Sequence, residues 1–309
     1  MAWTVREIPD QSGRVVVVTG GNGGLGLETA RMLAAAGAEV VIAARNAQKA
    51  EGALATIRGS VPEAKVSVLP LDLSSLASVR GFTERWLGER GTLDVLVNNA
   101  GVMAIPRTLS ADGYEMQFAT NHLGHFALTL GLMPALQARP GARVVTVSSA
   151  VHWGGSVHFD DLDGATSYNE WARYAQSKLC NLLFTAELDR RLRAARADVK
   201  SLAAHPGYAA TDLQHVAGRQ TGLTVTSLTM KVGNALVAQS AANGALPTVR
   251  AATDPAAESG QFWGPRVLGW FGAPVLAARA SAAKDEALAR KVWEVSEART
   301  GLSLAVARG

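Results

Sequence analysis

A chain of 309 residues, 48% hydrophobic and 18% charged, is long enough for one large α/β domain or two small ones with a sizeable core. The net charge of +4 is small for this length, and the densest basic stretch, 190–196, is typical of the solvated end of a helix, which argues against nucleic acid as a partner. The single cysteine, Cys180, excludes an internal disulfide framework and favours a reducing cytoplasm as the location.

The sequence predicts neither a secretory signal nor a membrane-spanning segment. Residues 1–10 carry Arg6, Glu7 and Asp10 and contain no apolar core, unlike a signal peptide. No stretch reaches about 18 apolar residues without a charge or a break, as a transmembrane helix requires. Because neither internal repeats nor low-complexity linkers divide the chain, we expect a single domain over residues 1–309.

Predicted strands and helices alternate along the chain. Residues 15–18 are four valines, which favour a strand buried on both faces, and a glycine-rich turn leads from them into a helix over 27–36. Further strands are predicted at 39–44, 65–71, 93–97, 142–148, 199–204 and, briefly, 261–263. Further helices are predicted at 47–58, from the turn at 72–75 to about 89, and at 112–138, 170–195 and 284–299. This order predicts a Rossmann-like, doubly wound parallel sheet of about seven strands with helices on both faces.

The segment from Pro206 to Gly269 interrupts this alternation with glycines between short apolar runs. An insertion after the sixth strand is well placed to cover a ligand, so we expect a substrate lid here. Trp263 is expected in the core, and Trp270 and Phe271 in the lid. A lipophilic or aromatic substrate is favoured by the apolar residues Val216, Leu223, Val225, Leu228, Met230 and Val232.

The predicted turn after the first strand has the composition of a phosphate site. Backbone N–H groups at a helix N-terminus point toward an anion, and glycines let it approach closely. The spacing, Gly20-x-x-x-Gly24-x-Gly26, departs from the G-x-G-x-x-G pattern of two-domain dehydrogenases. An ordinary glycine-rich βα turn is the alternative. The residues expected to contact a nucleotide are Gly20, Asn22, Gly23, Gly24, Leu25 and Gly26.

The residues after the second predicted strand indicate which nucleotide binds. NAD-binding sheets place a carboxylate there to hold the ribose hydroxyls, whereas this strand ends at Ala44 and is followed by Arg45. A guanidinium pairs well with phosphate, so NADP(H) is expected in preference to NAD(H). A surface arginine that begins a loop is the alternative. Asp72, after the third strand, either accepts a hydrogen bond from the adenine amino group or caps the next helix.

Candidate catalytic side chains follow the fourth and fifth strands and lie on the helix after them. Tyr174 and Lys178 are four residues apart, which puts them on one helical face, and a nearby ammonium lowers the pKa of a phenol. Ser149 ends the fifth strand, where its hydroxyl could hold a substrate oxygen. Residues 98–101, Asn-Asn-Ala-Gly, either line a nucleotide with little bulk or form a plain turn.

No metal site is predicted. The histidines at 122, 125, 152 and 158 form neither an H-E-x-x-H motif nor Cys/His ligand spacing. We expect His122 and His125 to be packing or capping groups of their helix. Cys180 is expected to be buried, and no neighbouring base in the sequence supports a nucleophile role.

Five motifs occur in one order along the chain: Thr19-Gly20-x-x-x-Gly24-x-Gly26, Asn98-Asn99-Ala100-Gly101, Ser149, Tyr174-x-x-x-Lys178 and His205-Pro206-Gly207. As a set they resemble the short-chain dehydrogenase/reductase superfamily over roughly residues 13–265. Finer details resemble the retinol-dehydrogenase and WW-domain-oxidoreductase-like branch of this superfamily. They are Ala44-Arg45-Asn46, the long gap from 149 to 174, and residues 121–126 and 177–184. The resemblance implies one domain, with a cofactor half over about 13–150, a catalytic helix and lid over about 150–275, and the closing helix.

The resemblance also implies a role for each motif residue. Tyr174 protonates the carbonyl oxygen during reduction, Lys178 lowers its pKa and binds the nicotinamide ribose, and Ser149 hydrogen-bonds the substrate oxygen. Asn121 holds a water that extends the proton relay through Lys178. Hydride passes between nicotinamide C4 and the carbonyl carbon. Further cofactor contacts are implied for Arg45, Asp72, Leu73, Asn98, Ala100, Gly101, Pro206, Gly207 and Thr211.

Two other functions stay open beside a carbonyl reductase or alcohol dehydrogenase. One is a non-catalytic NADP-binding regulatory protein on the same fold. The other is a C=C reductase similar to protochlorophyllide reductase, which has a similar tyrosine–lysine helix. The predicted helices at 112–138 and 170–195 could pack against those of a partner, as they do in members of the resembled family, so the resemblance implies a homodimer or homotetramer.

Overall fold

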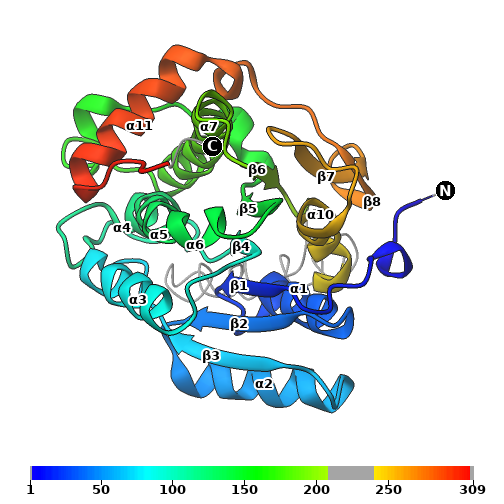
Figure 1. The fold of residues 1–309 in the computed structure, drawn as a ribbon. Helices are drawn as coiled ribbons and strands as arrows, with labels where there is room; N and C mark the ends of the chain where they lie inside the picture. The colour runs from blue at the N-terminus through cyan, green and yellow to red at the C-terminus, as the bar shows by residue number, and fades with distance from the viewer. Residues whose placement is uncertain (1, 208–239, 307–309) are drawn as a thin grey trace, which may run out of the picture.

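The computed structural model describes residues 2–207 and 240–306. Its strands form one eight-stranded sheet in the order β3-β2-β1-β4-β5-β6-β7-β8 (Figure 1). Every neighbouring pair is parallel except β7 and β8, which are antiparallel. The predicted Rossmann-like α/β fold is therefore confirmed, with one strand more than expected.

The first six strands form within two residues of their predicted bounds, because each is a run of β-branched or small apolar residues. Such runs suit a parallel sheet that is covered on both faces, and Val16, Val17 and Val18 have no exposed surface. The strands are β1 (Val15–Thr19), β2 (Glu39–Ala44), β3 (Val66–Pro70), β4 (Val95–Asn98), β5 (Ala142–Val147) and β6 (Val199–Ala204).

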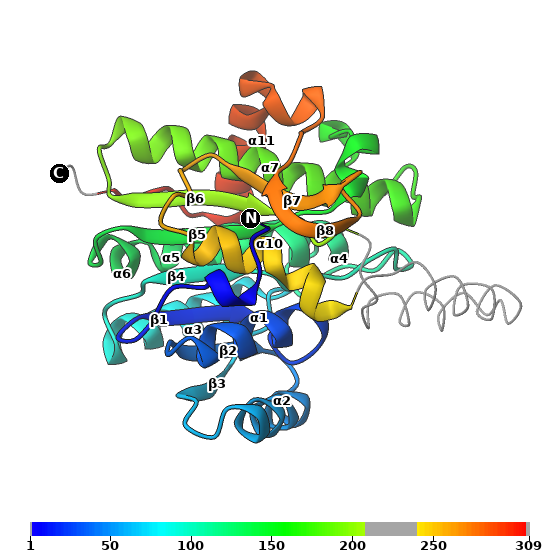
Figure 2. The same ribbon diagram turned by 90° about the vertical axis from the view of Figure 1, so that its right-hand side faces the viewer.

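Helices cover both faces of the sheet, and each face has its own hydrophobic core (Figures 1 and 2). One core lies under α1 (Gly24–Ala35), α2 (Ala47–Ser60) and α10 (Ala241–Thr253). The other lies under α3 (Leu76–Glu89), α5 (Gly124–Gly131), α6 (Met133–Gln137), α7 (Glu170–Ala194) and α11 (Glu286–Thr300). Within the described ranges, no helix is both long and apolar enough to cross a bilayer.

The long helix predicted at 112–138 begins later, at Met116, and is less regular than expected. A short α4 (Met116–Phe118) begins where the Glu115 carboxylate accepts the backbone N–H groups of Gln117 and Phe118. It is followed by a π-helical turn, η2 (Ala119–Leu123), before α5 and α6. π-turns insert one residue into a helix and often occur at functional sites, and this one contains Asn121.

The predicted lid is wrong where the structure describes it. Residues 241–253 form α10, a buried crossover helix between β6 and β7 that carries Pro247 in its interior, which explains why the sequence did not suggest a helix. The predicted seventh strand is confirmed as β7 (Phe262–Val267), and Trp263 is buried as expected. Phe271 begins an unpredicted strand, β8 (Phe271–Leu276), and Trp270 lies in the β7–β8 turn.

The rest of the predicted lid, including Thr211 and the apolar residues that favoured a lipophilic substrate, lies outside the described residues.

The closing helix α11 packs along α7 (Figure 1) and meets α5 at Phe126. The Trp293 ring stacks on Phe184 at 5.9 Å and meets Phe126 edge-on at 4.9 Å, while the Arg191 guanidinium lies 4.4 Å from its centre. At Phe126 and Phe184, this chain's own helix thus occupies the face that we expected to contact a partner.

Replacing Trp293 by alanine should lower the free energy of unfolding by about 3–5 kcal/mol, because the substitution removes a fully buried ring. Urea denaturation measures this loss. Trp171→Ala on α7 is the matched control, since that indole is 48% exposed, and it should cost about 1 kcal/mol or less. Equal losses in the two variants would contradict the packing described for α11.

Candidate active site

The turns that follow β1 and β4 interlock at the carboxyl edge of the sheet. Asn99 donates from Nδ2 to the Thr19 carbonyl at 2.9 Å, and the Thr19 hydroxyl accepts the backbone N–H groups of Asn99 and Ala100. Gly20 has φ +65°, and a Cβ on Gly26 would overlap the Gly20 carbonyl and lie 2.5 Å from the Asn99 amide. Glycine is therefore required at both positions by the backbone and by close packing.

The N-terminus of α1 is open to an anion. Its N-cap residue is Gly23, which supplies no side-chain hydrogen bond, and Gly24 follows with φ +51°. The first N–H groups of a helix have no partner within the helix, and they carry its positive dipole end. This turn therefore has the geometry that the sequence predicted for a phosphate site.

The residues at the end of β4 and in the turn after it differ in burial. The Asn98 side chain is completely buried and donates to the Thr129 hydroxyl at 3.0 Å, so it offers no exposed surface for the cofactor contact implied for it. Ala100 and Gly101 stay partly exposed. A Cβ on Gly101 would lie 3.0 Å from Asn121 Oδ1 and 3.5 Å from Lys178 Nζ, which places this turn directly beside both side chains.

Arg45 and Asp72 lie together at the ends of β2 and β3. The Arg45 side chain is 71% exposed, and its Nη1 lies 3.8 Å from Asp72 Oδ2. Asp72 Oδ1 accepts from both the backbone and the hydroxyl of Ser74, whereas α3 is capped by Ser75. The alternative that Asp72 caps the helix is thus wrong, because its carboxylate closes the preceding turn. The Leu73 side chain is buried in the core.

Ser149, Tyr174 and Lys178 meet where β5 ends against α7. Burial raises the pKa of Tyr174 to about 12, and its hydrogen bond with the Ser149 hydroxyl opposes that shift. Lys178 Nζ lies 5.7 Å from the Tyr174 ring centre and donates to the Val147 carbonyl at 3.2 Å. Burial lowers the pKa of Lys178 to about 8. Desolvation therefore dominates both groups, which is not the lowered tyrosine pKa that the sequence led us to expect.

Asn121 braces the turn after β4 against α7. Its Oδ1 accepts from the Val102 backbone N–H at 2.8 Å, and its Nδ2 donates to the Val102 carbonyl and to the Ser177 hydroxyl, both at 2.9 Å. The side chain has no exposed surface. The water-holding role implied by the resemblance stays a prediction.

The two histidines of this helical segment are structural in their contacts, as expected. Burial lowers the pKa of His122 to about 3 and of His125 to about 4, so both rings are neutral. His122 Nε2 lies 2.8 Å from the Ser296 hydroxyl on α11. Cys180 is buried. Across residues 2–207 and 240–306, no three His, Cys, Asp or Glu side chains gather in a way that could hold a metal ion.

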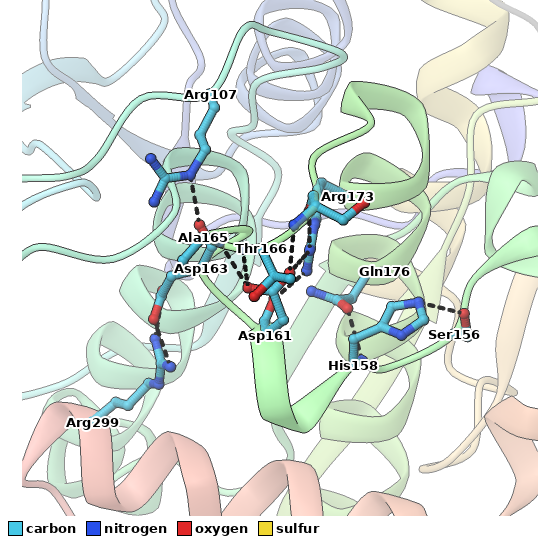
Figure 3. Close-up of polar contacts among 11 residues, drawn as sticks. Arg107, Ser156, His158, Asp161, Asp163, Ala165, Thr166, Arg173, Gln176 and Arg299 are labelled. Atoms are coloured by element: carbon cyan, nitrogen blue, oxygen red, sulfur yellow. Dashed lines mark hydrogen bonds and ion pairs between the residues drawn. The ribbon is translucent and has the colours of Figure 1, made fainter.

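The segment between Ser149 and Tyr174 is held by aspartates that the sequence did not single out (Figure 3). Asp161 accepts the backbone N–H of Ala165 at 2.7 Å and an Arg173 guanidinium N–H at 2.8 Å. Asp163 forms a two-pronged ion pair with Arg299 of α11, at 2.7 and 2.8 Å. The segment is thus fixed both to the helix that carries Tyr174 and to α11. Asp161 precedes a Gly-Ala-Thr-Ser run, a turn signal that could have been noticed.

A cavity of about 420 Å³ begins at Ala150, the residue after Ser149, and lies between η3 (Ala150–Gly154) and the β7–β8 hairpin. Its wall is mainly apolar and includes Trp153, Trp270 and Leu276, and its polar lining includes His152 and His205. Gly207, at the end of β6, lies against the same hairpin, because a Cβ there would overlap Trp270 and Pro265. The predicted nicotinamide end and this cavity are therefore neighbours.

The model of the short chain dehydrogenase family matches residues 14–222. The chain belongs to this family. It is 40% identical to retinol dehydrogenase 13 of Homo sapiens over 296 residues, which cover 94% of this chain and 85% of that protein. A polyprenol dehydrogenase of Mus musculus is 46% identical over 215 residues, covering 68% and 64% of the two chains. The crystal structure of an uncharacterized protein from Mycobacterium paratuberculosis is 41% identical, with a TM-score of 0.82 and coverage of 99% and 100%.

Short chain dehydrogenases use nicotinamide cofactors, and the carboxyl edge of this sheet fits one. The α1 N-terminus offers uncapped N–H groups to a phosphate, and the glycines at 20, 26 and 101 leave no room for side chains where the turns converge. Lys178 and Tyr174 lie beside the turn after β4, as the dehydrogenase motifs predicted.

Gly26→Ala tests this cradle. The added methyl group must push the turns after β1 and β4 apart, and a strain of about 1–3 kcal/mol should weaken binding of the nicotinamide cofactor by about tenfold or more. Calorimetric titration measures the affinity. Gly52→Ala in α2 is the control, because a Cβ there meets nothing within 4 Å. Unchanged affinity in Gly26→Ala would refute this placement of the cofactor.

Proposed function

We propose that this chain is an NADP(H)-dependent oxidoreductase that transfers hydride between nicotinamide and a lipophilic or aromatic ketone or aldehyde, or the corresponding alcohol. The observation that carries the proposal is the meeting of Ser149, Tyr174 and Lys178, in which the Ser149 hydroxyl acts on the pKa of Tyr174 and Lys178 Nζ lies 5.7 Å from the Tyr174 ring centre. The glycine turn and Gly207 lie at the same edge of the sheet. The family supplies the reaction class, and the named relatives act on alcohols.

The protein groups supply hydrogen bonds and a proton. The bound cofactor gives or takes the hydride. In this proposal the Ser149 hydroxyl donates to a substrate carbonyl oxygen, and the Tyr174 phenol protonates the same atom. The raised pKa of Tyr174 keeps the phenol protonated at neutral pH, the form that carbonyl reduction needs. Lys178 is held by the Val147 carbonyl within reach of the phenol ring.

The cavity beside Ser149 supports a lipophilic substrate. Its volume of about 420 Å³ lies within the range of small-molecule sites, and tryptophan and leucine side chains form much of its wall. Burial lowers the pKa of His205 to about 4, so that ring adds no charge. Retinol and polyprenol, the alcohols in the names of two relatives, are apolar alcohols of this kind.

We further propose a cytoplasmic location, on the single reduced cysteine, and a homodimer or homotetramer. Any such oligomer must leave Phe126 and Phe184 to α11 or displace that helix.

Tyr174→Phe is the test of catalysis. NADPH oxidation by the parent protein, screened against aryl ketones, aldehydes, quinones and steroids, should identify a substrate, and the variant should lose at least about a hundredfold in kcat because it has no phenol proton to transfer. Tyr114→Phe, whose hydroxyl only donates to the Arg299 carbonyl, is the matched control. NADPH binding without turnover of any substrate would instead indicate a non-catalytic regulatory protein. Reduction of a C=C bond would indicate a reductase similar to protochlorophyllide reductase.

Arg45→Asp tests the cofactor preference. A carboxylate at this position repels a 2′-phosphate and accepts hydrogen bonds from ribose hydroxyls, so the ratio of kcat/KM for NADPH over NADH should fall and reverse. Arg290→Asp on α11 is the control, since it makes the same charge change on an exposed arginine of another helix. A ratio that stays unchanged in Arg45→Asp would overturn the assignment.

A further inference from the structure

His152 makes two hydrogen bonds to Ser149, which lies three residues before it in the chain. Its backbone N–H donates to the Ser149 carbonyl at 3.1 Å, and its ring Nδ1 lies 2.7 Å from the same oxygen. A carbonyl only accepts hydrogen bonds, so the ring proton is on Nδ1. The side chain is 1% exposed, and this ring position is therefore fixed by its surroundings.

The other ring nitrogen reaches a distant part of the chain. Nε2 accepts the backbone N–H of Ala280 at 3.3 Å, in the segment that follows β8. A neutral imidazole has one donor and one acceptor, and this tautomer uses both. Burial lowers the pKa of His152, which favours the neutral ring. Phe262 of β7 meets the ring edge-on at 5.7 Å.

The backbone at Ser148 is anchored to β6 and α7, whereas the Ser149 hydroxyl itself has few described contacts. The Ser149 hydroxyl accepts from the Val151 N–H at 3.4 Å, a long hydrogen bond, while its other described contact is with Tyr174. The imidazole thus joins the serine turn to the chain segment that forms the far wall of the 420 Å³ cavity. The Ser149 backbone is thereby tied to the segment that follows β8.

We propose that His152 is a positioning residue for Ser149, acting through the Nδ1–H bond to the serine carbonyl. The inference rests on the proposed function, because Ser149 holds a substrate oxygen only if that reaction takes place. A displacement of a reacting group by about 1 Å can cost about a hundredfold in rate. Loss of the Nδ1 donor should therefore lower kcat, while the cofactor site at the β1 turn is untouched.

Two amide substitutions separate the two ring contacts. In His152→Asn the amide nitrogen lies near the position of Nδ1 and can still donate to Ser149. In His152→Gln the amide lies near Nε2 and can still accept from Ala280. With the carbonyl that the parent enzyme reduces best, we expect His152→Asn to stay within about threefold of the parent kcat, and His152→Gln to fall by about tenfold to a hundredfold. The KM for NADPH should be unchanged in both.

His158→Gln is the matched control, because among the described residues the hydrogen bond of that imidazole is with the Ser156 hydroxyl, and this variant should match the parent. If His152→Gln keeps the parent kcat, or if Asn and Gln lose kcat equally and in step with their melting temperatures, the positioning role is wrong. If either variant fails to fold, His152→Ala is assayed with added imidazole, which can enter through the cavity that His152 lines. Recovery of kcat supports the proposal, and no recovery in the folded variant contradicts it. A parent that reduces no carbonyl would refute the proposed function itself, before any variant is compared.

Discussion

The hydroxyl of Thr19 is the contact on which the arrangement of the site depends. It accepts the N–H groups of Asn99 and Ala100 and lies 2.9 Å from His125 Nε2. His125 Nδ1 faces the Asn121 carbonyl, so Nε2 is an acceptor and the threonine proton points to it. One hydroxyl thereby joins the end of β1, the turn after β4 and the π-turn. The low pKa of His125 keeps the ring in the neutral form that this chain of bonds needs.

A second set of contacts fixes α7 relative to that edge. The Ser148 hydroxyl donates to the Lys178 carbonyl at 2.7 Å, and the amide of Asn181 donates to the Val147 carbonyl that also accepts from Lys178. The end of β5 is thus attached to the middle of α7 by side chains of both elements. Buried polar contacts of this kind are costly when broken, so they specify one arrangement of Ser149, Tyr174 and Lys178.

The sequence was most informative where local composition decides structure. The four valines of β1 favour a strand buried on both faces, and the motif glycines lie where positive φ or close packing requires them. It was least informative where contacts between distant residues decide. Nothing local marks the π-turn at Asn121, the burial of Asn98, or the helical Pro247, because each depends on a partner element. The expectation that the pKa of Tyr174 is lowered was wrong for the same reason, because the spacing of the residues shows a nearby ammonium but does not show that the phenol is buried.

The packing of Trp293 also bears on the order in which the protein is made. Phe126 and Phe184 belong to α5 and α7, but the ring that covers them lies in a helix that leaves the ribosome more than a hundred residues after Phe184. Until α11 emerges, a nascent chain exposes this aromatic surface, which is the condition under which partly made domains bind chaperones or aggregate. The aromatic core against α7 is therefore completed only after α11 has been synthesised.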